Sequence, residues 1–95
     1  MKVEAIVTLL STAAADPKRL TSAVVVLQHA VWRGEVEGPK EAIGVLRDLA
    51  VNLDYYEPDA ARRGEDRTFF GEEIALAAVR IALAEIGRVM NLATE

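Results

Sequence analysis

Apolar residues recur at every third or fourth position along most of the chain, which is the period of one face of an α-helix. In the first stretch the apolar positions are Val3, Ile6, Val7 and Leu10. Three further stretches have the same spacing, and together they predict four helices, at about residues 2–14, 17–33, 39–53 and 71–92. The pattern therefore predicts an all-α fold.

Proline and glycine mark the ends of the predicted helices. Asp16 supplies a capping oxygen and Pro17 needs no N–H partner in a first turn, so a helix begins here. Gly34 is a natural stop for that helix, and Pro39 opens the next one. Because short connections join the first three helices, neighbours are expected to pack antiparallel. We predict a four-helix bundle forming one domain over residues 1–95.

The connection before the last helix, residues 54–70, differs in composition from the rest of the chain. It carries a net charge of −2, and four of the five aromatic residues lie near its ends: Tyr55, Tyr56, Phe69 and Phe70. Long connections in small domains tend to carry function, and the aromatic content speaks against disorder. Pro58 and Asp59 predict a short helical turn that ends at Gly64.

Two interpretations of the 54–70 segment follow. In the first, the aromatic pairs close the end of the bundle, Asp66 or Thr68 caps the last helix, and the charged side chains form solvated ion pairs. In the second, its first part is an interface, because tyrosine buries a large area at low entropic cost and keeps a hydroxyl for hydrogen bonding. Adjacent side chains in a turn usually diverge, so one tyrosine can serve the core while the other faces a partner. The candidate partner-binding residues are Asp54, Tyr55, Tyr56, Glu57 and Asp59.

Residues 52–58 are Asn-Leu-Asp-Tyr-Tyr-Glu-Pro, and this run resembles a motif of the bacteriocin immunity proteins of the colicin and pyocin type. Members of that family carry Asp-Leu-Ile-Tyr-Tyr-Pro on a short third helix. The residues that match in place are Leu53, Tyr55 and Tyr56. Asn52 stands in place of the leading aspartate, Asp54 in place of the isoleucine, and Glu57 is inserted before Pro58. The resemblance implies a small acidic bacterial four-helix protein whose two tyrosines contact a toxin.

Composition and charge narrow the possible partners and location. The chain has 95 residues, a net charge of −4 and 52% hydrophobic residues, but 16 of these are alanines, which predicts a thin core. A domain this small buries limited surface and has a low free energy of unfolding, so self-association is an open alternative that would stabilise it. The negative net charge argues against nucleic acid as a partner, but it is compatible with binding to a basic protein. Because no long apolar run or signal peptide is present, we expect no membrane contact and a soluble, cytoplasmic protein.

The residue types that support catalysis are poorly represented. There is no cysteine, which excludes disulfides, thiolate nucleophiles and cysteine-ligated zinc. The one histidine, His29, lies off the apolar stripe of its helix and has no second histidine to complete a metal site. The carboxylates match no calcium-binding loop, and no serine or threonine lies beside an evident base. We therefore expect no enzymatic activity, no cofactor and no metal.

The predicted helix at residues 71–92 is apolar or alanine on almost every side between Ile74 and Ala84. Such a helix is either central in its own bundle or covered by a partner. We therefore expect a homodimer or a hetero-complex with this helix near the interface. The function predicted is a non-catalytic binding protein, such as an immunity protein or an antitoxin-like inhibitor. The alternative is a structural or oligomerisation module in which the 54–70 segment only closes the core.

Overall fold

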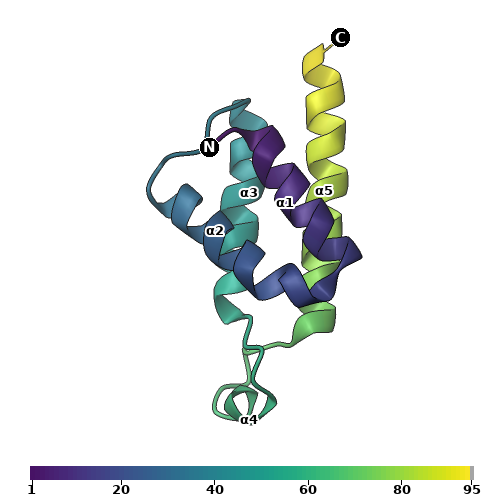
Figure 1. The fold of residues 1–95 in the computed structure, drawn as a ribbon. Coiled ribbons are helices and arrows are strands. Elements are labelled where there is room, and N and C mark those ends of the chain that lie inside the picture. Colours follow the sequence, from purple (N-terminus) through teal and green to yellow (C-terminus); the bar gives the residue numbers. More distant parts are fainter. Residues whose placement is uncertain (95) are drawn as a thin grey trace.

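The computed structural model describes residues 1–94, which form helices, turns and loops. The α-helices are α1 (Val3–Ala15), α2 (Leu20–Trp32), α3 (Lys40–Asn52), α4 (Ala60–Arg63) and α5 (Glu72–Thr94). Two 3₁₀ turns, η1 (Pro17–Arg19) and η2 (Leu53–Tyr55), precede α2 and follow α3. The all-α prediction is confirmed, and Figure 1 shows the course of the chain.

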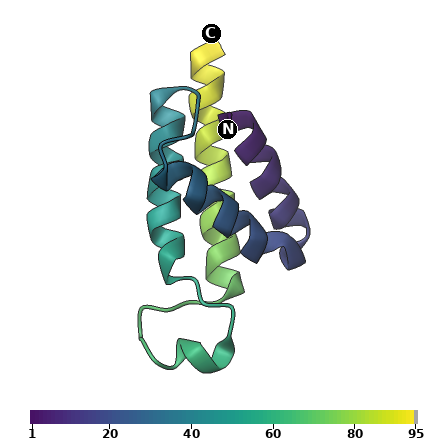
Figure 2. The ribbon, with the colours of Figure 1, turned by 60° about the vertical axis from the view of Figure 1, so that its left-hand side comes forward.

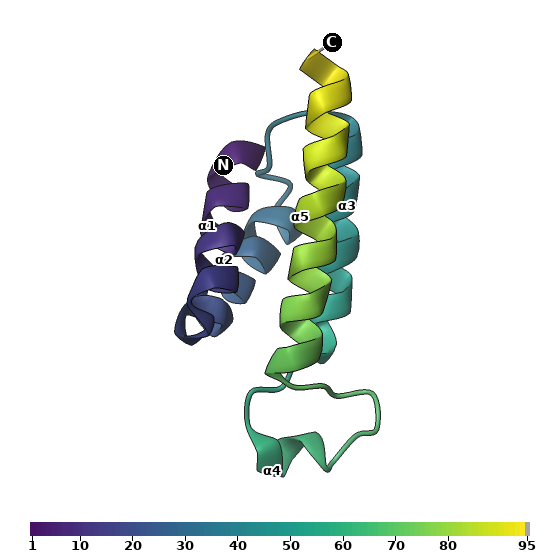
Figure 3. The same ribbon diagram turned by 90° about the vertical axis from the view of Figure 1, so that its right-hand side faces the viewer.

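α3 and α5 lie side by side, α2 crosses them obliquely, and α4 lies apart from the four long helices beyond the lower end of α3 and α5 (Figures 1 and 2). α1 packs against α2 and α5, while α3 packs against α2 and α5. α3 and α5 run alongside each other for most of the length of α3 (Figure 3). The last turns of α5 extend beyond the other helices, and the molecule measures 47 × 26 × 19 Å.

The ends of α2 show how local chemistry sets the helix limits. A carboxylate oxygen of Asp16 accepts a hydrogen bond from the Lys18 N–H at 3.4 Å, but the turn that follows Pro17 is 3₁₀, so α2 begins only at Leu20. At the other end Gly34 has a φ of +67°. Its N–H donates to the Val31 carbonyl at 3.1 Å, and the next N–H, of Glu35, donates to Ala30 at 2.9 Å. This pair of bonds is the Schellman motif, which favours glycine at the left-handed position.

The core consists of aliphatic side chains from the four long helices and η2. Its largest fully buried members are Ile6, Leu10, Leu20, Leu27, Leu46, Leu53, Ile86, Val3 and Val79. The remaining core positions are Val24, Leu49, Leu76 and seven alanines, namely Ala13, Ala23, Ala30, Ala42, Ala50, Ala75 and Ala82. No aromatic, polar or charged side chain is buried among the described residues. The core is thus built from small and medium side chains, as the alanine content predicts.

The α2–α3 connection is held against the start of α1 by backbone hydrogen bonds. The Val3 N–H donates to the Glu37 carbonyl at 2.9 Å, and the Glu37 N–H donates to the Met1 carbonyl at 2.8 Å. Gly38, the next residue, has a φ of +155° and lies directly against the Val3 side chain. The first residues of the chain therefore tie the α2–α3 connection to the fully buried Val3.

Candidate protein-interaction site

The 54–70 segment forms a loop that is closed at its base. Tyr56 and Phe70 lie opposite each other in a parallel β-bridge. The Phe70 N–H donates to the Tyr55 carbonyl at 3.0 Å, and the Glu57 N–H donates to the Phe70 carbonyl at 2.9 Å. Residues 57–69 therefore project from the end of α3 and α5 as a closed loop with α4 at its tip (Figures 2 and 3).

Tyr56 joins the base of this loop to the helices. Its ring stacks on Phe70, with the centroids 6.5 Å apart and the planes at 26°. Its hydroxyl shares a hydrogen bond of 3.2 Å with the hydroxyl of Thr21 on α2. Both rings are half-buried and pack against the end of the aliphatic core. Tyr56 thus closes the core, and sequence spacing gave no signal for its partner Thr21.

Tyr55 lies in a different environment from its neighbour. It is the last residue of η2, and its side chain is 46% exposed. Asp54, one residue earlier, is also exposed. The two tyrosines therefore diverge, with Tyr56 against the core and Tyr55 at the surface. Of the predicted partner-binding residues, the exposed ones are Asp54, Tyr55 and Asp59.

Two candidate carboxylates are used to shape the loop. Glu57 is half-buried, and its Oε1 accepts a hydrogen bond from the Asp59 N–H at 3.1 Å. Asp59 Oδ1 accepts from the Ala61 N–H at 2.9 Å and so caps α4, which ends before Gly64. A carboxylate at a helix N-terminus satisfies a donor that has no partner within the helix. These bonds hold the first half of the loop in one conformation.

The charged residues of the 54–70 segment do not form the ion pairs that the first interpretation expected. Within residues 1–94 the one ion pair is Arg19 with Asp16, at 3.4 Å, outside this segment. Glu57, Asp59 and Asp66 accept instead from backbone N–H groups two residues away, which immobilises less side chain than pairing two long charged groups. The Arg63 guanidinium lies over Gly71, in space that a Cβ on residue 71 would fill.

Asp66 caps a turn within the loop, and neither it nor Thr68 caps α5 as expected. Its Oδ1 accepts from the Thr68 N–H at 2.8 Å and from the Thr68 hydroxyl at 2.7 Å. The Phe69 N–H donates to the Asp66 carbonyl at 3.2 Å, which completes the turn. At the start of α5 the Ala75 N–H donates to the Gly71 carbonyl at 3.2 Å. Both capping candidates, Asp66 and Thr68, are therefore used within the loop.

The Asp66 carboxyl gives a testable pH dependence. The Thr68 N–H, and secondarily the Thr68 hydroxyl, lower its pKa below the usual value of 3.8 because both stabilise the carboxylate. The turn is therefore stabilised above pH 3.8, and this contribution is lost as the pH falls through the lower pKa of the folded state. We expect an NMR titration of the Asp66 carboxyl carbon with a midpoint below 3.8, and a shift of the Thr68 amide resonance at the same midpoint. A midpoint at or above 3.8 contradicts the turn.

We compared the chain with protein-family models, curated proteins and solved structures, and none of the three comparisons found a relative.

Within residues 1–94 no helix combines the length and the apolar character needed to cross a membrane.

Proposed function

We propose that the protein is a non-catalytic binding protein that engages a basic partner protein through Tyr55 and the acidic residues beside it. The observation that carries this proposal is a 46% exposed tyrosine at the base of a loop whose shape is set by its own hydrogen bonds. Tyrosine is among the commonest residues at the centre of protein interfaces. A surface held in one conformation before binding loses little entropy when it binds.

The other candidate residues have distinct roles in this proposal. Asp54 and Asp59 form an exposed acidic rim, while Glu57 supports the loop and Tyr56 anchors it to the core. The rim and the net charge of −4 favour a partner with a positive patch and speed their encounter. The four long helices serve as a four-helix bundle that holds the 54–70 segment as its long connection.

The partner class proposed is a toxin, and the role that of an immunity protein or antitoxin-like inhibitor in the bacterial cytoplasm. The resemblance of Leu53, Tyr55 and Tyr56 to the immunity-protein motif supports this choice. In this chain Tyr55 would make the contact, and Tyr56 would hold it in place through Thr21 and Phe70.

Affinity capture with Tyr55→Ala tests the proposal. Wild type and variant are immobilised and exposed to the same host lysate, and the captured proteins are quantified by mass spectrometry. We expect a basic protein whose recovery falls at least ~10-fold with Tyr55→Ala, because truncating an interface tyrosine removes buried area and a hydroxyl. Recovery should also fall as salt is raised, because the rim charges are screened.

Ser11→Ala is the matched control, since Ser11 is exposed on α1. It should recover the same protein in the same amount as wild type. All three proteins should melt at nearly the same temperature, because neither substitution removes a buried side chain. Equal partner sets for wild type and Tyr55→Ala would refute the assignment.

The second candidate function is a structural module that forms a homodimer, with the 54–70 segment only closing the core. The observation that favours it is the exposure of Ile74 and Ile81 on α5, at 59% and 67%. The two functions use different residues, so substitutions at Tyr55 and at Ile81 separate them.

A further inference from the structure

One face of α5 is covered by no other element of the described chain. It carries the exposed residues Ile74, Ala77, Ile81 and Ala84, which recur every three or four positions. The opposite face packs into the core with Ala75, Val79, Ala82 and Ile86. Large exposed aliphatic residues at helical spacing are typical of a helix that packs against a partner.

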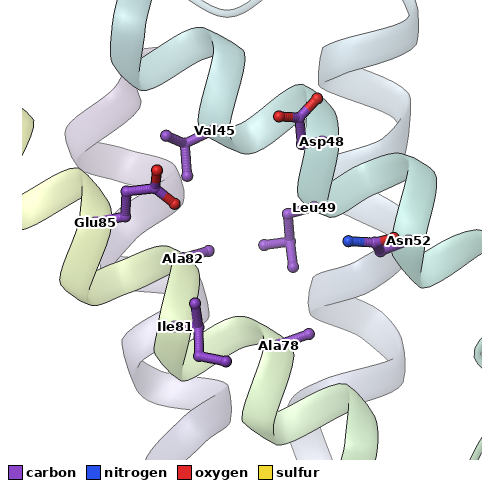
Figure 4. A pocket seen from close by; sticks show the side chains of 8 residues that line it. All are labelled: Val45, Asp48, Leu49, Asn52, Ala78, Ile81, Ala82 and Glu85. Carbon is purple, nitrogen blue, oxygen red and sulfur yellow. The ribbon is translucent and has the colours of Figure 1, made fainter.

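A groove runs beside this face, between α3 and α5 (Figure 4). It encloses about 200 Å³. Leu49 from α3, with Ala78 and Ala82 from α5, supplies apolar lining, while Asp48, Asn52 and Glu85 supply polar groups. Ile81 itself lies on the α5 side of the groove and is 67% exposed. A two-fold symmetric contact uses the same surface on both copies, so a protruding aliphatic side chain beside a groove with apolar lining can serve both.

We propose that the occupant of this face is a second copy of the chain, with the two α5 helices antiparallel about a two-fold axis at Ile81. In this arrangement the two Ile81 side chains meet at the axis, each beside the groove of the other copy. Residues equally spaced on either side of Ile81 then face each other. Ile74 lies seven positions before and Arg88 seven after, so the methylenes of Arg88 cover Ile74. Ala78 faces Ala84, and these small side chains let the helix axes approach to about 8–10 Å.

The charges on α5 select this orientation. Glu73 is exposed in the first turn of the helix, and Arg88 is exposed in its second half. The antiparallel arrangement places Glu73 of one copy beside Arg88 of the other, twice per dimer. A parallel arrangement about the same face places Glu85 and Arg88 each near its own copy, and like charges in contact oppose association. The face is therefore complementary to itself in only one of the two orientations.

Ile81→Asp tests whether this face is the interface. Sedimentation equilibrium of the wild type should give a mass of twice 10.3 kDa. The variant should be monomeric, with a dissociation constant raised at least ~100-fold, because two carboxylates would be buried at the axis. Its melting curve should show a folded protein, since the side chain is exposed in the monomer. Val51→Asp is the control, because Val51 is 55% exposed on α3 and does not line the groove. It should stay dimeric.

Charge reversal tests the orientation. Glu73→Arg and Arg88→Glu should each raise the dissociation constant by about 5- to 30-fold, since each places like charges together at two sites. The double variant exchanges the two charges and should return to within about threefold of wild type. A wild type that is monomeric at about 0.5 mM, or an Ile81→Asp variant that associates like wild type, overturns the proposal. Failure of the double variant to recover overturns the antiparallel orientation.

Discussion

Replacement of Tyr56 by alanine is expected to lower the free energy of unfolding by about 2–4 kcal/mol. The ring is half-buried, stacks on Phe70 and packs against the end of the aliphatic core. Its loss opens a cavity there and removes the hydroxyl that bonds to Thr21. Tyr55→Ala is expected to cost only about 0.5 kcal/mol or less, because that side chain is 46% exposed. Urea unfolding followed by circular dichroism measures both.

Two further measurements separate the contributions of Tyr56. Tyr56→Phe keeps the ring and removes only the hydroxyl, so it should cost about 0.5–1 kcal/mol. Hydrogen exchange at the Glu57 and Phe70 amides, which close the base of the loop, should accelerate in Tyr56→Ala and stay close to wild type in Tyr56→Phe. Equal destabilisation by Tyr55→Ala and Tyr56→Ala would contradict the placement of Tyr56 against the core and of Tyr55 at the surface.

The helices were predictable because their signals are local. The three-or-four spacing of apolar residues identifies each long helix, and Gly34 marks the end of α2 by a conformation that glycine adopts at no steric cost. Pro17 likewise marks where helical backbone begins. The difference at residues 17–19, which are 3₁₀, lies within the uncertainty of any helix end. Spacing alone does not determine which hydrogen bonds the first turn makes.

Composition singled out residues 54–70 as the candidate site, and adjacent positions in a turn predicted that Tyr55 and Tyr56 diverge. Which of the two faces the core depends on Thr21, which is 35 residues away on α2. Contacts of that kind arise from how helices meet in space and leave no periodic signal. The first interpretation pairs the charged side chains with one another, but the Glu57 and Asp59 carboxylates bind nearby backbone N–H groups. A list of charges does not distinguish these two uses of a carboxylate.

Replacement of Gly38 by alanine is expected to destabilise the protein by about 2–4 kcal/mol. Its φ of +155° is a backbone conformation that residues with a Cβ rarely adopt. An added Cβ would also collide with the Val3 side chain, which is fully buried and cannot move aside without disturbing the core. The strain falls on the backbone hydrogen bonds that tie Val3 to Glu37. Thermal unfolding should show a melting temperature lowered by roughly 10–20 °C.

The same substitution at two other glycines isolates the cause. Gly34→Ala adds a Cβ at a φ of +67° with no atom within 4 Å, so only the backbone strain of about 1–2 kcal/mol applies. Gly44→Ala lies inside α3, also with no atom within 4 Å, and should stabilise by about 0.5–1 kcal/mol, because alanine favours the helix. The expected order of melting temperatures is therefore Gly44→Ala above wild type, then Gly34→Ala, then Gly38→Ala. If Gly38→Ala melts with Gly34→Ala, the contact with Val3 contributes nothing, and the connection between α2 and α3 is held by its hydrogen bonds alone.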